Sequence, residues 1–132
     1  MFRLILATVS AYIVGKERKN HAKSGGSRTM AVIGMSACLI AIISLELSKS
    51  YNLDVLRLMQ GALQGIGFIG AGIVWQNKNG VEGLTTASSL FATVILGFLY
   101  GFGMYFYAIL SSIALYFLLE SKYWNNKGDK NE

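Results

Sequence analysis

The sequence predicts an all-α protein that crosses a membrane several times. Of its 132 residues, 53% are hydrophobic and only 14% are charged, whereas soluble domains carry about a quarter charged residues. It has fifteen glycines and no proline. Five apolar stretches follow one another between short polar segments. A compact soluble helical domain is the alternative to a membrane protein.

The first apolar stretch, residues 1–14, predicts a short membrane helix interrupted only by Arg3. A basic start followed by an apolar run is also typical of a signal peptide, and Ala7 to Ala11 resembles a cleavage site. No soluble domain that would need export follows. We therefore interpret the stretch as a retained helix, although it is shorter than the roughly 20 residues of a full span.

A basic segment, residues 15–28, separates this helix from a second one predicted over residues 29–47. Five basic residues stand there against one acidic residue, namely Lys16, Arg18, Lys19, Lys23 and Arg28 against Glu17. In the second helix small residues recur at helical spacing: Gly34, Ala37, Cys38, Ala41 and Ser44. Small residues let helices approach closely in membranes. We expect Cys38 to be a packing residue and not a reactive thiol.

The third helix, predicted over residues 54–75 and capped by Asn52 or Asp54, is expected to be the centre of the bundle. Its aliphatic side chains share one arc: Leu58, Met59, Ala62, Leu63, Ile66, Ile69 and Ile73. A helix-packing face is predicted from its glycines, namely Gly61, Gly65, Gly67, Gly70 and Gly72, with Gln60 and Gln64 beside them. We expect neighbouring helices to cover the glycines and lipid to cover the aliphatic arc.

Two further helices are predicted over residues 83–100 and 104–119, with a tight turn at Gly101–Gly103. The fourth begins with a run of hydroxyl residues and places Thr86, Ser89, Thr93 and Gly97 on one face. Aromatic residues gather at both ends of the fifth, as in the aromatic belts of membrane proteins. Residues 1–120 thus form one membrane domain, and residues 121–132 form a polar cytoplasmic tail.

The orientation follows from the distribution of lysine and arginine, which are enriched on the cytoplasmic side. Five spans put nine of these residues on one side and three on the other, the three being Arg3, Lys49 and Arg57. The N-terminus is therefore expected outside and the C-terminus in the cytoplasm. Asp54, Arg57 and Gln60 then lie at the outer end, and Gln64 lies near mid-depth.

The same topology brings three distant segments to the cytoplasmic end. They contribute the residues of a predicted polar site: Glu17, Arg28, Thr29, Thr85 and Thr86. We expect Glu17 and Arg28 to pair beneath the threonines. The alternative is that both charges are solvated and that the threonines only cap the fourth helix.

Several motifs together resemble the MgtC/SapB family of bacterial inner-membrane proteins over nearly the whole chain. They are Gly15–Arg18, Gly26–Thr29, Asp54-x-x-Arg57, Gln60-Gly61, Gly65–Gly72 and Gly83–Ala87. The resemblance implies a small multi-span domain in the bacterial inner membrane and a link to magnesium limitation. For the virulence-type members it also implies survival inside macrophages and restraint of the F-type ATP synthase.

The chain departs from the virulence-type members in three ways. Those members carry a soluble cytoplasmic domain after the last span, whereas this chain ends about a dozen residues after it. They often have Gly-Leu-Asn-Thr where this chain has Gly83-Leu84-Thr85-Thr86, and tryptophan in place of Phe91. The resemblance therefore transfers the membrane domain more firmly than the virulence role.

The first function hypothesis is a non-enzymatic regulator that binds another membrane protein, such as the F-type ATP synthase, through helix faces. The alternative is a small oligomeric transporter or channel, because polar groups such as Gln60 and Gln64 inside a membrane often mark a pathway. No nucleophile–base pair, metal-ligand cluster or phosphate loop is apparent in the sequence. We expect no catalytic site, no metal and no cofactor. The charge of +5 is attributed to cytoplasmic loops, with lipid and not nucleic acid as the surroundings.

Overall fold

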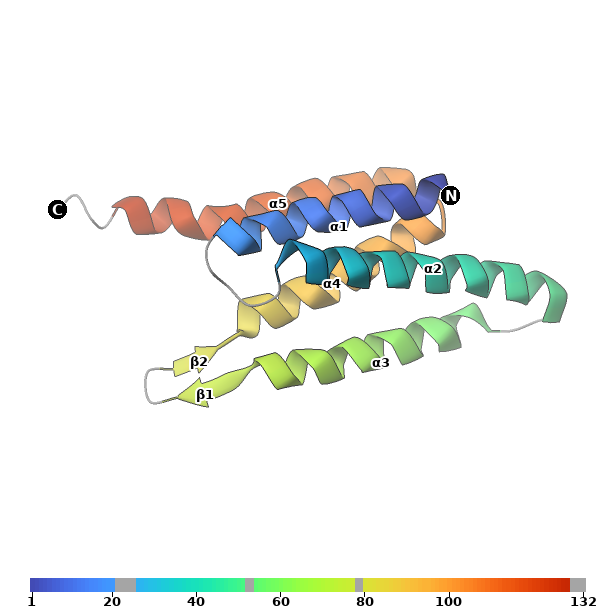
Figure 1. Cartoon of the computed structure of the whole chain (residues 1–132), viewed down its shortest axis with the longest axis horizontal. Coiled ribbons are helices and arrows are strands. Elements are labelled where there is room, and N and C mark those ends of the chain that lie inside the picture. The colour runs from blue at the N-terminus through green and yellow to red at the C-terminus, as the bar shows by residue number, and fades with distance from the viewer. Residues whose placement is uncertain (21–25, 52–53, 78–79, 129–132) are drawn as a thin grey trace.

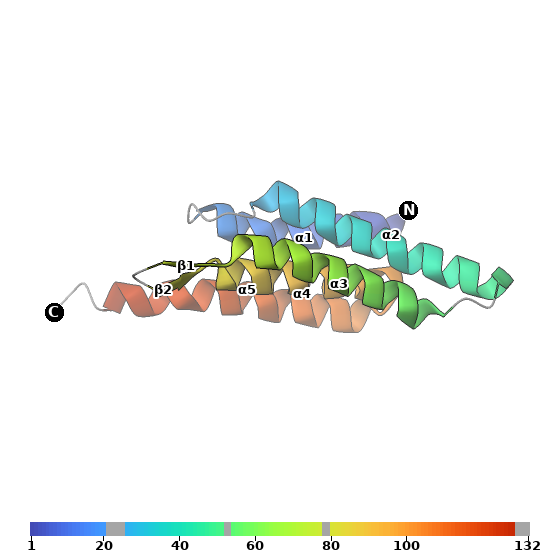
Figure 2. The same ribbon diagram turned by 90° about the horizontal axis from the view of Figure 1, so that it is seen from below.

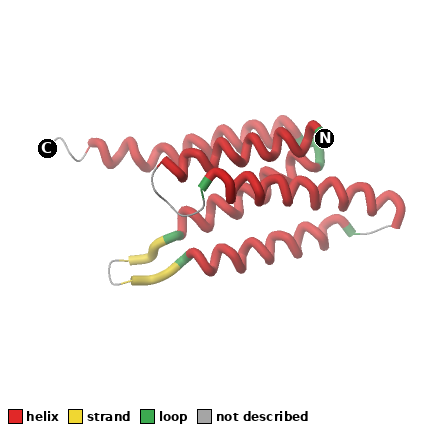
Figure 3. The backbone as a smooth tube through the Cα atoms, viewed as in Figure 1, coloured by secondary structure: helices red, strands yellow, loops and turns green. Residues whose placement is uncertain are grey.

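The computed structural model describes residues 1–20, 26–51, 54–77 and 80–128, and the side chains of these except 17–20, 77 and 121–128. It contains the five predicted helices and one small hairpin (Figures 1 and 3). The helices are α1 Phe2–Asn20, α2 Ser27–Tyr51, α3 Val55–Ile73, α4 Leu84–Gly101 and α5 Tyr105–Gly128, and the hairpin pairs β1 Trp75–Asn77 with β2 Gly80–Glu82.

The central helix of the bundle is α4. It contacts each of the other four helices, and α5, α1, α2 and α3 surround it in that order (Figures 1 and 2). Ten of its residues are buried, whereas only Ile66 and Gly70 are buried on α3. The expectation that the third helix is central is therefore wrong, because α3 lies at the edge of the bundle.

Three helices are longer than the sequence predicts: α1, α5 and α2, which spans Ser27–Tyr51 instead of residues 29–47. α1 continues through the basic segment to Asn20, because lysine, arginine and glutamate favour helix and no proline interrupts them. Gly15 lies inside this helix, and a Cβ on it would stand 2.6 Å from the Cα of Ser27. Glycine there lets the start of α2 approach α1. α5 likewise continues to Gly128 instead of ending at residue 119.

The connection from α3 to α4 is a hairpin, and Trp75, predicted as the last residue of the third helix, belongs to its first strand. Trp75 pairs with Glu82 across it, and the Trp75 indole Nε1 donates to Glu82 Oε2 at 3.1 Å. Gly83 then turns the chain into α4 with a φ of +81°, and a Cβ on it would collide with the Ile73 carbonyl oxygen. Glycine is thus required at position 83 for two reasons: the backbone has a positive φ there, and the last residue of α3 leaves no room for a Cβ.

The start of α3 follows the sequence closely. Asp54 is its N-cap, and Asp54 Oδ1 accepts a hydrogen bond from the Leu56 N–H at 2.9 Å. This confirms Asp54 as a capping residue.

The connections lie at two opposite ends of the bundle (Figure 1). The ends of α1 and α5, the starts of α2 and α4 and the hairpin share one end. The N-terminus, the α2–α3 connection and the α4–α5 turn share the other, where Arg3 Nη1 donates to the Gly101 carbonyl oxygen at 2.9 Å. Among the described residues, Ser27–Tyr51 and Leu84–Gly101 are long and apolar enough to cross a membrane, and Tyr105–Glu120 is a shorter apolar helix.

Candidate functional site

The polar site predicted at the basic end is only partly assembled in the described part of the chain. Thr86 is buried and Thr85 half-buried at the start of α4, whereas Arg28 and Thr29 are exposed on the first turn of α2. The side chain of Glu17 lies outside the described residues. The pairing of Glu17 with Arg28 therefore stays a prediction, and the structure does not enclose Arg28 and Thr29 with Thr86.

The hydroxyl groups along α4 form hydrogen bonds within their own helix. Ser89 Oγ donates to the Thr86 carbonyl oxygen at 2.8 Å, and Thr93 Oγ1 donates to the Ser89 carbonyl oxygen at 2.8 Å. Thr93 Oγ1 also lies 3.4 Å from Met30 Sδ on α2. Thr86, Ser89 and Thr93 are all buried, which agrees with their predicted position on one face of the fourth helix. Such back-bonding satisfies a buried hydroxyl without a ligand, so this row supports packing.

The helices α2 and α4 cross in close contact. A Cβ on Gly97 would stand 2.5 Å from the Gly34 carbonyl oxygen, and one on Gly101 would stand 2.5 Å from Ala41 Cβ. The small residues predicted on α2 are all buried, including Cys38. This confirms the predicted packing face of the second helix, which is paired with glycines four residues apart on α4.

The prediction of which face of α3 packs against the other helices of the chain is wrong. Ile66 is buried on α3, and Met59, Ala62, Leu63 and Ile73 pack against the core, although the sequence assigned all of them to lipid. The reason is shape: α2 and α4 approach through glycine and alanine, and the long aliphatic side chains of α3 pack against the core that these helices form. Of the predicted glycine face, only Gly70 is covered, with Ala87 Cβ 3.5 Å from its added Cβ.

The opposite side of α3 is exposed, and we call it the outer face of α3. It consists of Gln60, Gly61, Gln64, Gly65, Gly67, Phe68 and Gly72, all exposed. For each of its four glycines, no described atom beyond the helix's own backbone and adjacent residues lies within 4 Å of an added Cβ. Asp54 and Arg57, at the start of the helix, are exposed as well. The predicted outer-end polar residues therefore lie on the surface of the bundle.

Comparison with known proteins assigns the chain to a family. A model of the MgtC family matches residues 4–127. The chain belongs to the MgtC family. It is thus a membrane protein, in agreement with its two long apolar helices. Among the described residues of this MgtC-family chain, no three His, Cys, Asp or Glu side chains gather to hold a metal ion.

Several curated relatives align with most of the chain. YhiD of Escherichia coli (strain K12), whose name provisionally describes a magnesium transporter, is 36% identical over 126 residues, which is 91% of this chain and 59% of YhiD. Protein SapB of Bacillus subtilis (strain 168) is 33% identical, over 94% of this chain and 56% of SapB. Protein MgtC of Salmonella typhimurium (strain LT2) is 28% identical, over 87% of this chain and 48% of MgtC.

The chain spans about half to three-fifths of the length of these relatives. The matched part includes α2, α3 and α4 and all but the outermost residues of α1 and α5. No solved structure matches the chain.

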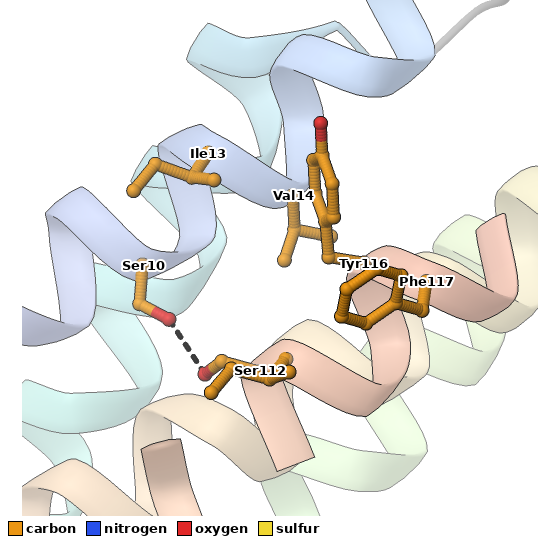
Figure 4. A pocket seen from close by; sticks show the side chains of 7 residues that line it. Ser10, Ile13, Val14, Ser112, Tyr116 and Phe117 are labelled. Carbon is orange, nitrogen blue, oxygen red and sulfur yellow. Dashed lines mark hydrogen bonds between the residues drawn. The ribbon is translucent and has the colours of Figure 1, made fainter. Parts of the chain in front are cut away.

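A pocket between α1 and α5 was missed by the sequence analysis (Figure 4). Its volume is about 270 Å³, and Ser10, Ile13, Val14, Ser112, Ile113, Tyr116 and Phe117 line it. Ser10 Oγ and Ser112 Oγ are joined by a 2.7 Å hydrogen bond across it. The lining residues are about a hundred positions apart in the sequence, and only the packing of α1 beside α5 brings them together.

Proposed function

We propose that this protein is a non-enzymatic regulator of another membrane protein, which it binds through the outer face of α3. The observation that supports this most is the exposure of glycines and glutamines along one side of that helix. Lipid chains gain nothing from contact with a glutamine amide. A second helix would gain both close backbone contact and side-chain hydrogen bonds.

The spacing on the outer face suits a helix as the partner. Gly61 and Gly65 lie four residues apart, so they stand on adjacent turns, and Gln60 and Gln64 repeat at the same interval. This pattern of small residues four apart is typical of helix pairs in membranes, where amide side chains also bond across the contact. It repeats on α3 the spacing of Gly97 and Gly101 at the α2–α4 crossing.

The proposal places all five helices across the inner membrane of a bacterium, with the N-terminus outside and the C-terminus in the cytoplasm. The connections at the two ends of the bundle alternate as five spans require, and nine of twelve lysines and arginines belong to one side. A reporter fused after Glu132 should be active only in the cytoplasm. If the reporter is active only in the periplasm, the C-terminus lies outside and the orientation is the opposite of the one proposed.

The regulated partner that we favour is the F-type ATP synthase, and magnesium limitation is the condition in which we expect the regulation. Both come from the resemblance of the motifs to the family. The alternative is a small oligomeric transporter, to which the name of YhiD points. Because Gln60 and Gln64 lie on the surface of one chain, they would line a pathway only between several copies.

Photo-crosslinking from the outer face of α3 tests the proposal. Phe68 is 86% exposed on that face, and Phe106 is 74% exposed on α5, which makes the two phenylalanines a matched pair. Each is replaced by p-benzoylphenylalanine in magnesium-limited cells. We expect a membrane subunit of the ATP synthase to be crosslinked from position 68 and not from position 106, and we expect Gly65→Leu to abolish the crosslink.

Other results would change the conclusion in defined ways. Crosslinks to a second copy of this chain, together with saturable magnesium flux in liposomes that Gln64→Leu abolishes, would favour the transporter. Equal crosslinking from positions 68 and 106 would show that the outer face of α3 contacts only lipid or random neighbours, and would refute the regulator proposal in this form.

A further inference from the structure

The side chain of Arg57 makes no polar contact within the described part of the chain. It is exposed on the first turn of α3, and its guanidinium has no hydrogen-bond or ion-pair partner there. Lys49, exposed near the end of α2, differs from it, because Lys49 Nζ lies 3.3 Å from Glu46 Oε2. Asp54 stands one turn before Arg57, but its Oδ1 accepts from the Leu56 N–H and caps the helix. Arg57 is thus available to a group outside the chain.

The position of Arg57 along α3 does not favour the stability of that helix. The free N–H groups of a first turn give the start of a helix a partial positive charge, which favours acidic side chains and opposes basic ones. The first turn of α3 has no acidic residue, and Arg57 stands in it. A glutamate at this position would suit the isolated helix better. A role of Arg57 in binding would explain an arginine that neither the helix nor its neighbours need.

Arg57 lies at the centre of the outer face of α3. At about 100° per residue, it stands about 180° round the helix from Ile66, which is buried against the core. Gln64 and Phe68 lie within about 20° of it, one on either side. Gly61 is four residues farther, about 6 Å along the helix axis. A partner helix that contacts Gly61 would therefore also cover the guanidinium.

The charge of Arg57 limits what can dock on this face. A guanidinium that a partner covers without pairing loses its water and is strongly unfavourable. It needs an acceptor on the partner, and a carboxylate can bind it through two parallel hydrogen bonds. A second copy of the chain does not provide this. In a symmetric pair of α3 helices with the same orientation, residues at the centre of the contact meet their own counterparts, so two arginines would face each other and repel.

We propose that the helix docked on the outer face of α3 belongs to a different membrane protein and carries an aspartate or glutamate that pairs with Arg57. The acidic residue lies near the outer end of that helix, about one turn from the residues that contact Gly61. Gln60 and Gln64 add amide hydrogen bonds farther along the same contact. This inference rests on the proposed function and adds the chemistry of the partner to it.

The test uses the full chain in its native membranes, with p-benzoylphenylalanine at position 68. Arg57→Glu reverses the charge, Arg57→Gln removes it, and Lys49→Glu is the control, because it reverses a charge that already has a partner within the chain. We expect Arg57→Glu to lower the yield of the crosslink at least tenfold, Arg57→Gln to lower it less, and Lys49→Glu to change it less than twofold.

The Tm of each variant in detergent separates loss of binding from loss of folding. Because a glutamate suits the first turn of a helix, the Tm of Arg57→Glu should equal or exceed that of the wild-type chain. If Arg57→Glu nevertheless lowers Tm, the comparison of Arg57→Gln with the wild-type chain decides the test, since glutamine introduces no new charge.

Mass spectrometry of the crosslinked product identifies the docked helix, and a charge exchange completes the test. Replacing the outer acidic residue of that helix with arginine should abolish the crosslink to the wild-type chain and restore it to Arg57→Glu. A docked helix without an acidic residue, or a crosslink that Arg57→Glu leaves unchanged, would overturn this inference and leave the regulator proposal intact; Arg57 would then face lipid headgroups. A wild-type chain that crosslinks to no protein, or only to a second copy, would overturn both.

Discussion

Glycines occur in two regions of this protein with opposite surroundings. At the α2–α4 crossing, Gly34, Gly97 and Gly101 are buried. A Cβ on Gly97 or Gly101 would stand 2.5 Å from an atom of α2, and one on Gly34 would stand 2.6 Å from Ala11 Cβ on α1. On the outer face of α3, no described atom from elsewhere in the chain lies within 4 Å of a Cβ added to Gly61 or Gly65. Glycine therefore allows two helices to pack closely in one region, whereas in the other region it lies on a helix surface that no described helix covers.

The difference shows what glycine spacing does and does not specify. Two glycines four residues apart provide a flat helix surface for close approach, but the partner must provide a matching one. For the glycines of α4, the matching surface consists of Gly34, Ala37 and Ala41 on α2. The outer face of α3 has no such counterpart among the described residues. The partner helix that we propose would supply the missing matching surface.

The largest effect is expected at the α2–α4 crossing. Gly97→Leu should prevent accumulation of folded protein, because its side chain would have to occupy the position of the α2 backbone. Gly97→Ala adds only one methyl group and should lower the free energy of unfolding by about 1–3 kcal/mol, as overpacking does. Detergent-stable protein is measured by size-exclusion chromatography, with Gly61→Ala as the control. Equal behaviour of Gly97→Ala and Gly61→Ala would contradict the comparison.

The second effect concerns the inner side of α3. Ile66 is only 7% exposed and packs into the core, whereas Ile69, on the same helix, is 50% exposed. Ile66→Ala should cost about 2–5 kcal/mol, as for other large-to-small core substitutions, and Ile69→Ala much less. Thermal unfolding followed by circular dichroism measures both. If the two variants lose equal stability, α3 is rotated relative to the structure.

These two regions also show how far the sequence could predict the fold. The number of helices, the small-residue face of α2 and the Asp54 cap depend on local patterns, and they were predicted correctly. The rotation of α3 was not, because periodicity separates two faces of a helix without telling which one meets the protein. Lipid and protein interior are similarly apolar, so Ile66 suits both. The pocket at Ser10 and Ser112 depends on helix positions that no local pattern contains.

A smaller effect is expected where α3 and α4 are connected. Gly83 and Gly80 both have positive φ values, of +81° and +131°, but only Gly83 is in close contact with Ile73. Both substitutions strain the backbone, which costs about 1–3 kcal/mol, and Gly83→Ala should lower stability more than Gly80→Ala because its Cβ would also collide with the Ile73 carbonyl oxygen. The difference in Tm between these two variants measures the contact. A larger loss for Gly80→Ala would show that the hairpin, and not the end of α3, requires glycine.

The smallest effect on stability, and the sharpest test of the comparison, is expected at Gly65. Because a side chain there would enter open space, Gly65→Leu should change the free energy of unfolding of the isolated chain by no more than about 0.5 kcal/mol, as for other surface substitutions. Its bulk would nevertheless separate α3 from a docked helix. The expected result is an unchanged Tm in detergent together with loss of the crosslink from position 68 in cells. Gly65→Ala, which adds a single methyl group at the same position, is the control for a substitution too small to hold a docked helix away from α3. A lower Tm for Gly65→Leu alone would mean that a neighbour within the chain covers Gly65, and the two glycine regions would then serve the same purpose.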